Sequence, residues 1–164
     1  MAEYKTSRGF SIEIDPSRDD LLDIIGKERL ADSYMMDGET SPQERYAYVS
    51  ALFANDKDHA QRLYDYASQL WFGYATPILS MGRNSNGLPI SCFLVNVPDS
   101  KKGLVDSLAE TNWLSMLGGG VGVYWAVRGE DEKSVGVIPH MKVYDDSCLA
   151  YKQGTTRRGA YAMY

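Results

Sequence analysis

Two short stretches of the sequence contain groups that could hold a phosphate. LGGGVGV places Gly118, Gly119 and Gly120 together, and glycines let backbone N–H groups approach an anion closely. Thr76 in ATPILS and Ser91 in ISCFL offer hydroxyl groups of the kind that bind phosphate beside the ends of strands. Each pattern has a structural alternative, because hydroxyls also cap turns and glycines between a helix and a strand also form a tight turn. For the glycines, the pattern alone favours the turn.

The two cysteines are separate candidates for thiol chemistry. Cys92 lies within ISCFLVNV, a continuous apolar run of strand length that predicts a strand covered on both faces. A cysteine in such a strand usually behaves as a small hydrophobic residue, and a redox role would require a second thiol nearby. Cys148 could in principle pair with Cys92, but free thiols are the default in a reducing compartment.

The stretch QGTTRR combines flexibility with hydrogen-bonding groups. Gln153, Arg157 and Arg158 could contact phosphates or the edges of bases, since arginine presents a fork of N–H donors. A solvated basic loop is the alternative. His59 and His140 are isolated, and no catalytic triad, metal-ligand cluster or carboxylate pair is visible, so the sequence predicts no metal site.

Composition limits the class of protein. The chain has 164 residues, of which 44% are hydrophobic, and this is enough for a packed core. A formal net charge of −5 argues against a protein that coats nucleic acid, because such a protein needs a surplus of Lys and Arg. No apolar run approaches the roughly 20 residues that span a bilayer, and the N-terminus lacks the apolar core of a signal peptide. We therefore expect a cytoplasmic protein with neither membrane nor nucleic acid as partner.

The first half of the sequence predicts mainly helices. FSIEID alternates like a short strand, and SRDDLLDIIGKERLADSY predicts a helix that is interrupted or ends near Gly26. Ser41, Pro42 and Glu44 form a capping box with proline in the first turn, so a helix should begin there. The stretch that follows predicts one more helix, with this apolar stripe: Ala60, Leu63, Ala67, Leu70 and Trp71.

The second half predicts alternating strands and helices. ISCFLVNV should be a strand, Asp99 or Ser100 should cap a helix over residues 101–117, and GVGVYWAV should be the next strand. This order predicts a βαβ unit with parallel strands and a right-handed crossover. GEDEKSVGVIPHMK predicts a polar loop, VYDDSCLAYKQ a short helix, and GAYAMY the start of a third strand.

Taken in order, these pieces resemble the large, catalytic subunit of class I ribonucleotide reductases. The resemblance runs from about Leu30 to Tyr164 and is carried by ADSYMMDGETSPQERY, ATPILSMGR with PISCFLVNVPDS, LGGGVGV and SCLAYKQGTTRRGAYAMY. It implies an α/β fold. An N-terminal helical region without an ATP cone, residues 1–74, would precede the first βαβ strands of a ten-stranded barrel, residues 75–164, incomplete at the C-terminus.

The resemblance also implies roles for the candidate residues. Cys92 matches a redox-active thiol whose partner thiol is absent from this chain. The residues that match the binding region for the substrate diphosphate are Thr76, Ser91, Cys92, Gly119 and Gly120. Cys148 matches no redox position, so its structural interpretation stands.

A second set of residues matches the allosteric specificity site. Asp99, Ser100 and Arg128 would lie near a nucleoside triphosphate effector, either a dNTP or ATP, beside a dimer-forming helix at 101–117. Gln153, Arg157 and Arg158 would lie on the loop that connects the effector base with the substrate base. Differential contact with two ligands is what allosteric coupling requires.

The resemblance further implies partners. The thiyl cysteine, the partner thiol, the tyrosines of the radical path and the C-terminal reducing cysteines have no counterpart in this sequence. We therefore expect an N-terminal part, such as one piece of a split or phage-type subunit, that is inactive alone. It would work with the C-terminal remainder of the large subunit, a metal-containing small subunit that supplies the radical, a ribonucleoside diphosphate and, indirectly, thioredoxin or glutaredoxin. The alternatives are a non-catalytic nucleotide-binding module of the same family and a truncated product.

Overall fold

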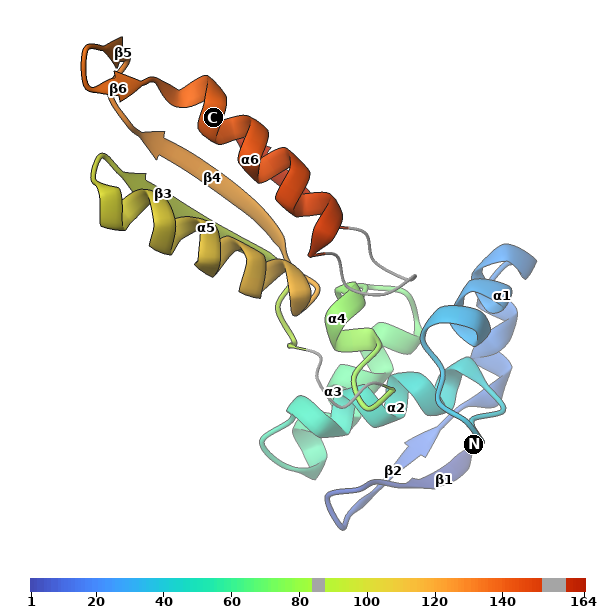
Figure 1. Ribbon diagram of the computed structural model, residues 1–164. Coiled ribbons are helices and arrows are strands. Elements are labelled where there is room, and N and C mark those ends of the chain that lie inside the picture. Colours follow the sequence, from blue (N-terminus) through green and yellow to red (C-terminus); the bar gives the residue numbers. More distant parts are fainter. Residues whose placement is uncertain (84–87, 152–158) are drawn as a thin grey trace. The chain divides into compact units, whose positions relative to one another are not determined.

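The computed structural model describes residues 1–83, 88–151 and 159–164. The chain divides into two compact units, residues 1–85 (unit 1) and residues 86–164 (unit 2), which Figure 1 shows in blue to green and in yellow to red. Within the described residues, no helix is both long enough and apolar enough to cross a membrane.

Unit 1 is mainly helical. A β-hairpin of β1 (Ala2–Lys5) and β2 (Ser11–Ile14) is followed by the 3₁₀ helix η1 (Pro16–Leu21). The α-helices are α1 (Ile24–Ser33), α2 (Pro42–Phe53), α3 (Lys57–Ser68) and the single turn α4 (Thr76–Leu79). Their apolar faces, together with the inward face of β2, form one core around Ile12, Val49 and Tyr64. The predicted helical region and its short N-terminal strand are confirmed.

Side chains define where the helices of unit 1 begin. Ser41 caps α2, and Glu44 completes the predicted capping box. Asp23 caps α1 by accepting from the N–H of Gly26 at 2.6 Å. The predicted interruption is present, since Leu22 and Asp23 separate η1 from α1, but it does not fall at Gly26, which lies in the first turn of α1.

The predicted apolar stripe of α3 is partly wrong. Ala60 and Ala67 are buried, but α3 ends at Ser68. Leu70 has a φ of 62°, a left-handed conformation that a helix cannot continue. Leu70 and Trp71 are consequently turned outward, with 48% and 68% of their surface exposed.

Unit 2 contains a parallel three-stranded sheet in the order β3–β4–β7. Its elements are β3 (Cys92–Pro98), α5 (Lys101–Met116), β4 (Gly120–Ala126), the short strands β5 (Glu130–Asp131) and β6 (Ser134–Val135), α6 (Val137–Ala150) and β7 (Tyr161–Met163). The predicted βαβ unit and third strand are confirmed. The predicted polar loop, residues 129–142, is instead the β5–β6 hairpin followed by residues 137–142 of α6, so α6 is longer than expected.

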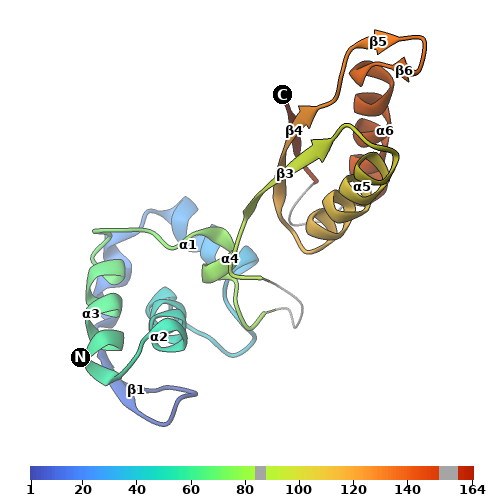
Figure 2. The same ribbon diagram turned by 90° about the vertical axis from the view of Figure 1, so that its left-hand side faces the viewer.

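Both helices cover the same face of this sheet. Successive right-handed crossovers that add strands in one direction place every crossover helix on one side, and Figure 2 shows α5 and α6 together there. Val95, Val97, Val121 and Val123 point toward them and form the core. The opposite face is uncovered, and Leu94 is 81% exposed on it. The prediction that β3 is covered on both faces is wrong in this structure, because the described residues supply helices for one face.

Candidate functional site

Cys92 lies at the N-terminal end of β3 on the uncovered face of the sheet. The prediction that Cys92 is buried within its strand is wrong, since its side chain is exposed. Ser91 Oγ lies 3.6 Å from Cys92 Sγ. In the parallel register Cys92 stands opposite Gly120, which has no side chain, so the thiol has open space beside it on β4. The structure thus brings together three of the predicted substrate-site residues.

Apart from Asn96, the rest of the uncovered face is apolar and aromatic. Leu94 stands opposite Gly122, and Gly122 pairs with Ala162 of β7. Tyr124 and Tyr164 contact each other with ring centroids 5.8 Å apart. The side chain of Leu94 lies over Gly122, where an added Cβ would meet its Cδ2 at 2.8 Å.

The glycine run closes α5 and begins β4. Gly118 has a φ of 87°, and its N–H donates to Ser115, while the N–H of Gly119 donates to Leu114. This pair of bonds is a Schellman motif, which satisfies the last carbonyl groups of the helix. The N–H of Gly120 donates to the carbonyl of Ser91 at 2.8 Å. The turn alternative therefore describes the local structure, and both predicted amides are already bonded.

We expect Gly119→Ala to destabilise unit 2. A Cβ at Gly119 would overlap the ring of Phe93, and overpacking of this kind costs about 1–3 kcal/mol of unfolding free energy. Gly120→Ala is the matched control, because its nearest neighbours would be the carbonyls of Ser91 at 3.7 Å and Ala160 at 3.8 Å, which is ordinary contact. Urea denaturation of both variants measures the difference, and equal stabilities would contradict the packing role of Gly119.

Two of the predicted effector residues meet at the other end of the sheet. Arg128 Nε lies 3.4 Å from Asp99 Oδ2 and 3.8 Å from Asp131 Oδ2. Ser100 caps α5 through the N–H of Gly103 at 2.9 Å. Because β3 has seven residues, this cluster and Cys92 are separated by roughly 20 Å along the strand. Unit 2 therefore carries two candidate sites, one at each end of the sheet.

Thr76 is the one predicted site residue that belongs to unit 1 among the described residues. Thr76 begins α4 in unit 1, and its Oγ1 lies 3.3 Å from the hydroxyl of Tyr34. Gln153, Arg157 and Arg158 lie outside the described residues. Cys148 is half-buried on α6, and burial raises the pKa of its thiol, which keeps it protonated and less nucleophilic.

One polar network of unit 2 was not predicted. Asn112 Oδ1 on α5 accepts hydrogen bonds from Ser147 Oγ on α6 and, at 3.1 Å, from Tyr161 Oη on β7. Sequence periodicity could not reveal it, because an asparagine within a helix usually faces solvent. The network fixes α5, α6 and β7 to one another.

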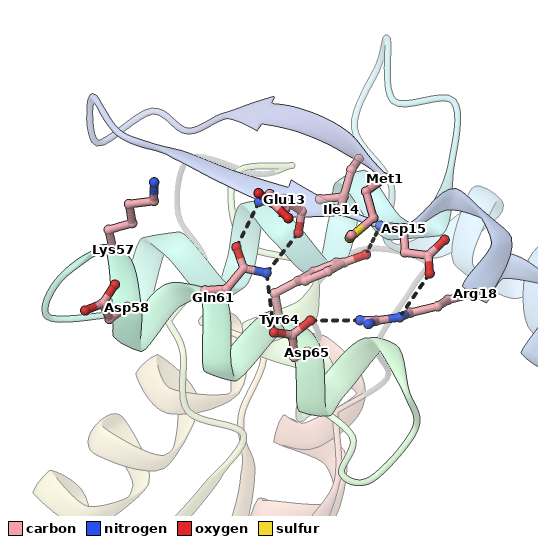
Figure 3. Close-up of a pocket in the computed structure, with 10 residues that line it drawn as sticks. All are labelled: Met1, Glu13, Ile14, Asp15, Arg18, Lys57, Asp58, Gln61, Tyr64 and Asp65. Atoms are coloured by element: carbon pink, nitrogen blue, oxygen red, sulfur yellow. Dashed lines mark hydrogen bonds and ion pairs between the residues drawn. The ribbon is translucent and has the colours of Figure 1, made fainter.

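A pocket of about 360 Å³ lies between β2 and α3 in unit 1 (Figure 3). Several of its polar groups bond one another. Arg18 Nη1 donates to Asp65 at 3.0 Å, Gln61 Nε2 donates to the carbonyl of Glu13, and the N–H of Glu13 donates back to Gln61. None of the residues predicted to do chemistry lines it, so we assign these contacts to fold stability.

A parallel sheet with its crossover helices on one face is the arrangement of part of an α/β barrel, and in this chain a helical unit precedes it. Two family models match the chain: the ribonucleotide reductase all-alpha domain over residues 20–87 and the ribonucleotide reductase barrel domain over residues 90–164. The chain belongs to the ribonucleotide reductase large-subunit family.

Named relatives agree with this assignment. The chain is 55% identical over 154 residues to the ribonucleoside-diphosphate reductase large subunit of Invertebrate iridescent virus 3, covering 93% of this chain and 24% of that protein. It is 56% identical over 153 residues to the same subunit of Invertebrate iridescent virus 6, of which it covers 16%. The chain thus spans a quarter or less of these relatives.

A solved structure matches the fold. The Actinobacillus ureae class Id ribonucleotide reductase alpha subunit superposes with a TM-score of 0.74 at 27% sequence identity. The match covers 87% of this chain and 28% of that one. A helical N-terminal region followed by a partial parallel sheet is therefore the fold of this chain, as expected.

Proposed function

We propose that this chain supplies one redox cysteine, Cys92, to a ribonucleoside-diphosphate reductase that makes deoxyribonucleotides for DNA synthesis. The observation that carries the proposal is the position of Cys92 on the sheet face opposite the buried Val95 and Val97, which α5 and α6 leave open. In an α/β barrel the helices form the outer ring, so the opposite face of the strands lines the interior. Cys92 would then point into the interior, where substrate would bind.

The proposed chemistry needs two thiols. Cys92 and a thiol from the remainder of the large subunit would become a disulfide and give up two electrons, while the ribose C2′–O bond is replaced by C–H and water leaves. A metal-containing small subunit would supply the radical, and thioredoxin or glutaredoxin would restore the thiols. Ser91, Thr76, Gly119 and Gly120 would hold the diphosphate. The N–H groups of Gly119 and Gly120 already donate hydrogen bonds within the protein. These glycines would therefore contribute by letting the diphosphate approach the backbone closely.

The opposite end of the sheet is our proposed specificity site. Asp99, Ser100 and Arg128 would bind a dNTP or ATP, with Gln153, Arg157 and Arg158 carrying the signal toward the substrate. A charged cluster next to the N-terminus of α5 suits such a ligand, because Arg128 is exposed and the helix end favours anions. The boundary between the helical region and the barrel region, at residues 74 and 75, stays part of this proposal. So does a cytoplasmic location, which for a viral protein is the cytoplasm of the host.

The decisive experiment uses the assembled enzyme. The chain is combined with the remainder of the large subunit and a radical-generating small subunit, and reduction of nucleoside diphosphates is followed. Deoxynucleotide formation that depends on this chain supports the proposal, whereas failure of the pieces to co-purify and to reduce substrate would overturn it.

We expect Trp113→Glu to weaken dimerisation through α5. Val105, Trp113 and Met116 form an exposed apolar strip on this helix, and a charge placed in it should raise the dimer dissociation constant at least about tenfold. Trp71→Glu in unit 1 is the matched control, since Trp71 is 68% exposed and Trp113 is 66% exposed. Sedimentation velocity with effector present measures both, and equal effects would remove α5 as the interface.

A non-catalytic nucleotide-binding module is the second candidate function. It is favoured by the Asp99–Arg128 pair and the apolar strip of α5, because unit 2 contains both features. Titration of dTTP or dATP into the isolated chain discriminates, because a self-sufficient module should bind and dimerise without any partner.

A further inference from the structure

Tyr34 and Thr76 meet in unit 1, although 42 positions separate them in sequence. Tyr34 is the residue that ends α1, and Thr76 is the first residue of α4. Their side-chain oxygens lie 3.3 Å apart, and both residues are half-buried. The contact joins a side chain with no assigned role to a predicted phosphate-binding residue.

The direction of this hydrogen bond follows from acidity. Either oxygen of this pair can donate by geometry, and a phenol is a better donor than an aliphatic alcohol, so we assign the Tyr34 O–H as the donor to Thr76 Oγ1. The hydrogen of Thr76 is then left to donate to another acceptor. The Thr76 carbonyl is already occupied, because Ser80 Oγ donates to it at 2.9 Å. Tyr34 thus leaves Thr76 as a donor, which is what an anionic phosphate oxygen requires.

The position of Tyr34 is fixed from behind by its backbone. The N–H of Tyr34 donates to Leu30 at 3.0 Å, and its carbonyl accepts from Arg45 Nη1 at 3.0 Å. Arg45 is itself fully buried, with Glu39 Oε1 3.6 Å from its Nε and the ring of Tyr48 4.5 Å from its guanidinium carbon. The phenol of Tyr34 therefore projects from a rigid support.

We propose that Tyr34 is a positioning residue for diphosphate binding, acting by orienting the hydroxyl of Thr76; this inference rests on the proposed function. The 3.3 Å separation is long for a hydroxyl pair, whose usual distance is about 2.7–2.8 Å, so this hydrogen bond is weak by itself. When Thr76 donates to an anion, its oxygen becomes a better acceptor and the two bonds reinforce each other. The effect of Tyr34 should thus appear in substrate binding.

Tyr34→Phe tests this in the assembled reductase. We expect the KM for the nucleoside diphosphate to rise about 3- to 10-fold, the value of one hydrogen bond, with kcat changed less than about twofold. Tyr74→Phe is the matched control. The Tyr74 hydroxyl also bonds a hydroxyl in unit 1, that of Ser50 at 2.8 Å, without contacting Thr76. Its loss should lower stability and leave KM unchanged.

A double-mutant cycle with Thr76→Val separates the possible failures. We expect Tyr34→Phe to have no further effect on KM once Thr76 is Val, because the mediating hydroxyl is gone. If Thr76→Val raises KM and Tyr34→Phe does not, the inference is wrong while the proposed substrate site stands. If the two effects on KM are additive, Tyr34 does not act through Thr76. If Thr76→Val itself leaves KM unchanged, the assignment of Thr76 to the diphosphate fails and the inference fails with it.

Discussion

Cys92→Ser should abolish deoxynucleotide formation by the assembled reductase, reducing kcat at least about a thousandfold, because a hydroxyl cannot form the disulfide that supplies the two electrons. The substitution should hardly affect stability, since the side chain is exposed on the uncovered face of the sheet. The measurement is a single-turnover assay with the reduced enzyme and no external reductant, together with thermal unfolding of each variant. Loss of product without loss of stability is the expected combination.

Cys148→Ser provides the matched control for this prediction. It makes the same atomic change at the other cysteine, which lies half-buried on α6 with its thiol pKa raised by burial. This variant should retain activity within about threefold, a range that small packing changes can produce. A Cys92→Ser enzyme that still forms product, or a Cys148→Ser enzyme that forms none, would show that the redox thiol has been assigned to the wrong residue.

The strand order of unit 2 could be predicted from the sequence, but the exposure of its strands could not. An apolar run of strand length, a capped helix and a second apolar run are sufficient for a βαβ unit, and the register of β3 with β4 agrees. The same run gives no information on how many faces are covered within this chain. Leu94 and Cys92 are exposed because α5 and α6 both pack on the other face, which is a property of crossover direction.

The sequence likewise predicted only some of the contacts in the candidate sites. Residues that lie close in sequence or at neighbouring strand ends, such as Ser91 with Cys92 and Asp99 with Arg128, are indeed together. Tyr34 was missed because its contact with Thr76 depends on how α1, α2 and α4 pack, and no periodicity encodes that packing. Arg45 was missed because a charged residue in a helix is normally expected to be solvated.

Arg45→Ala should reduce the unfolding free energy of the protein by about 3–5 kcal/mol, the usual cost of removing one partner from a buried ion pair. The Arg45 side chain is fully buried, and that of Glu39 is 8% exposed. Without Arg45, the Glu39 carboxylate stays buried with the N–H of Met36 as donor at 2.8 Å, and the contact with the Tyr48 ring is lost. Urea denaturation followed by circular dichroism measures the change.

The double variant Glu39→Gln with Arg45→Met is the control, and it should recover most of the lost stability, because replacing both charges removes the unpaired ion while keeping the volume. Burial raises the pKa of Glu39 above its ordinary value of 4.5, so the native state holds this proton more tightly than the unfolded state. The contribution of Glu39 to the unfolding free energy must then fall as pH rises from 4.5 through the raised pKa. The double variant, which lacks this carboxyl group, should lose that pH dependence. If Arg45→Ala is as stable as the double variant across this pH interval, loss of Arg45 leaves no costly unpaired charge on Glu39, and the ion-pair explanation is wrong.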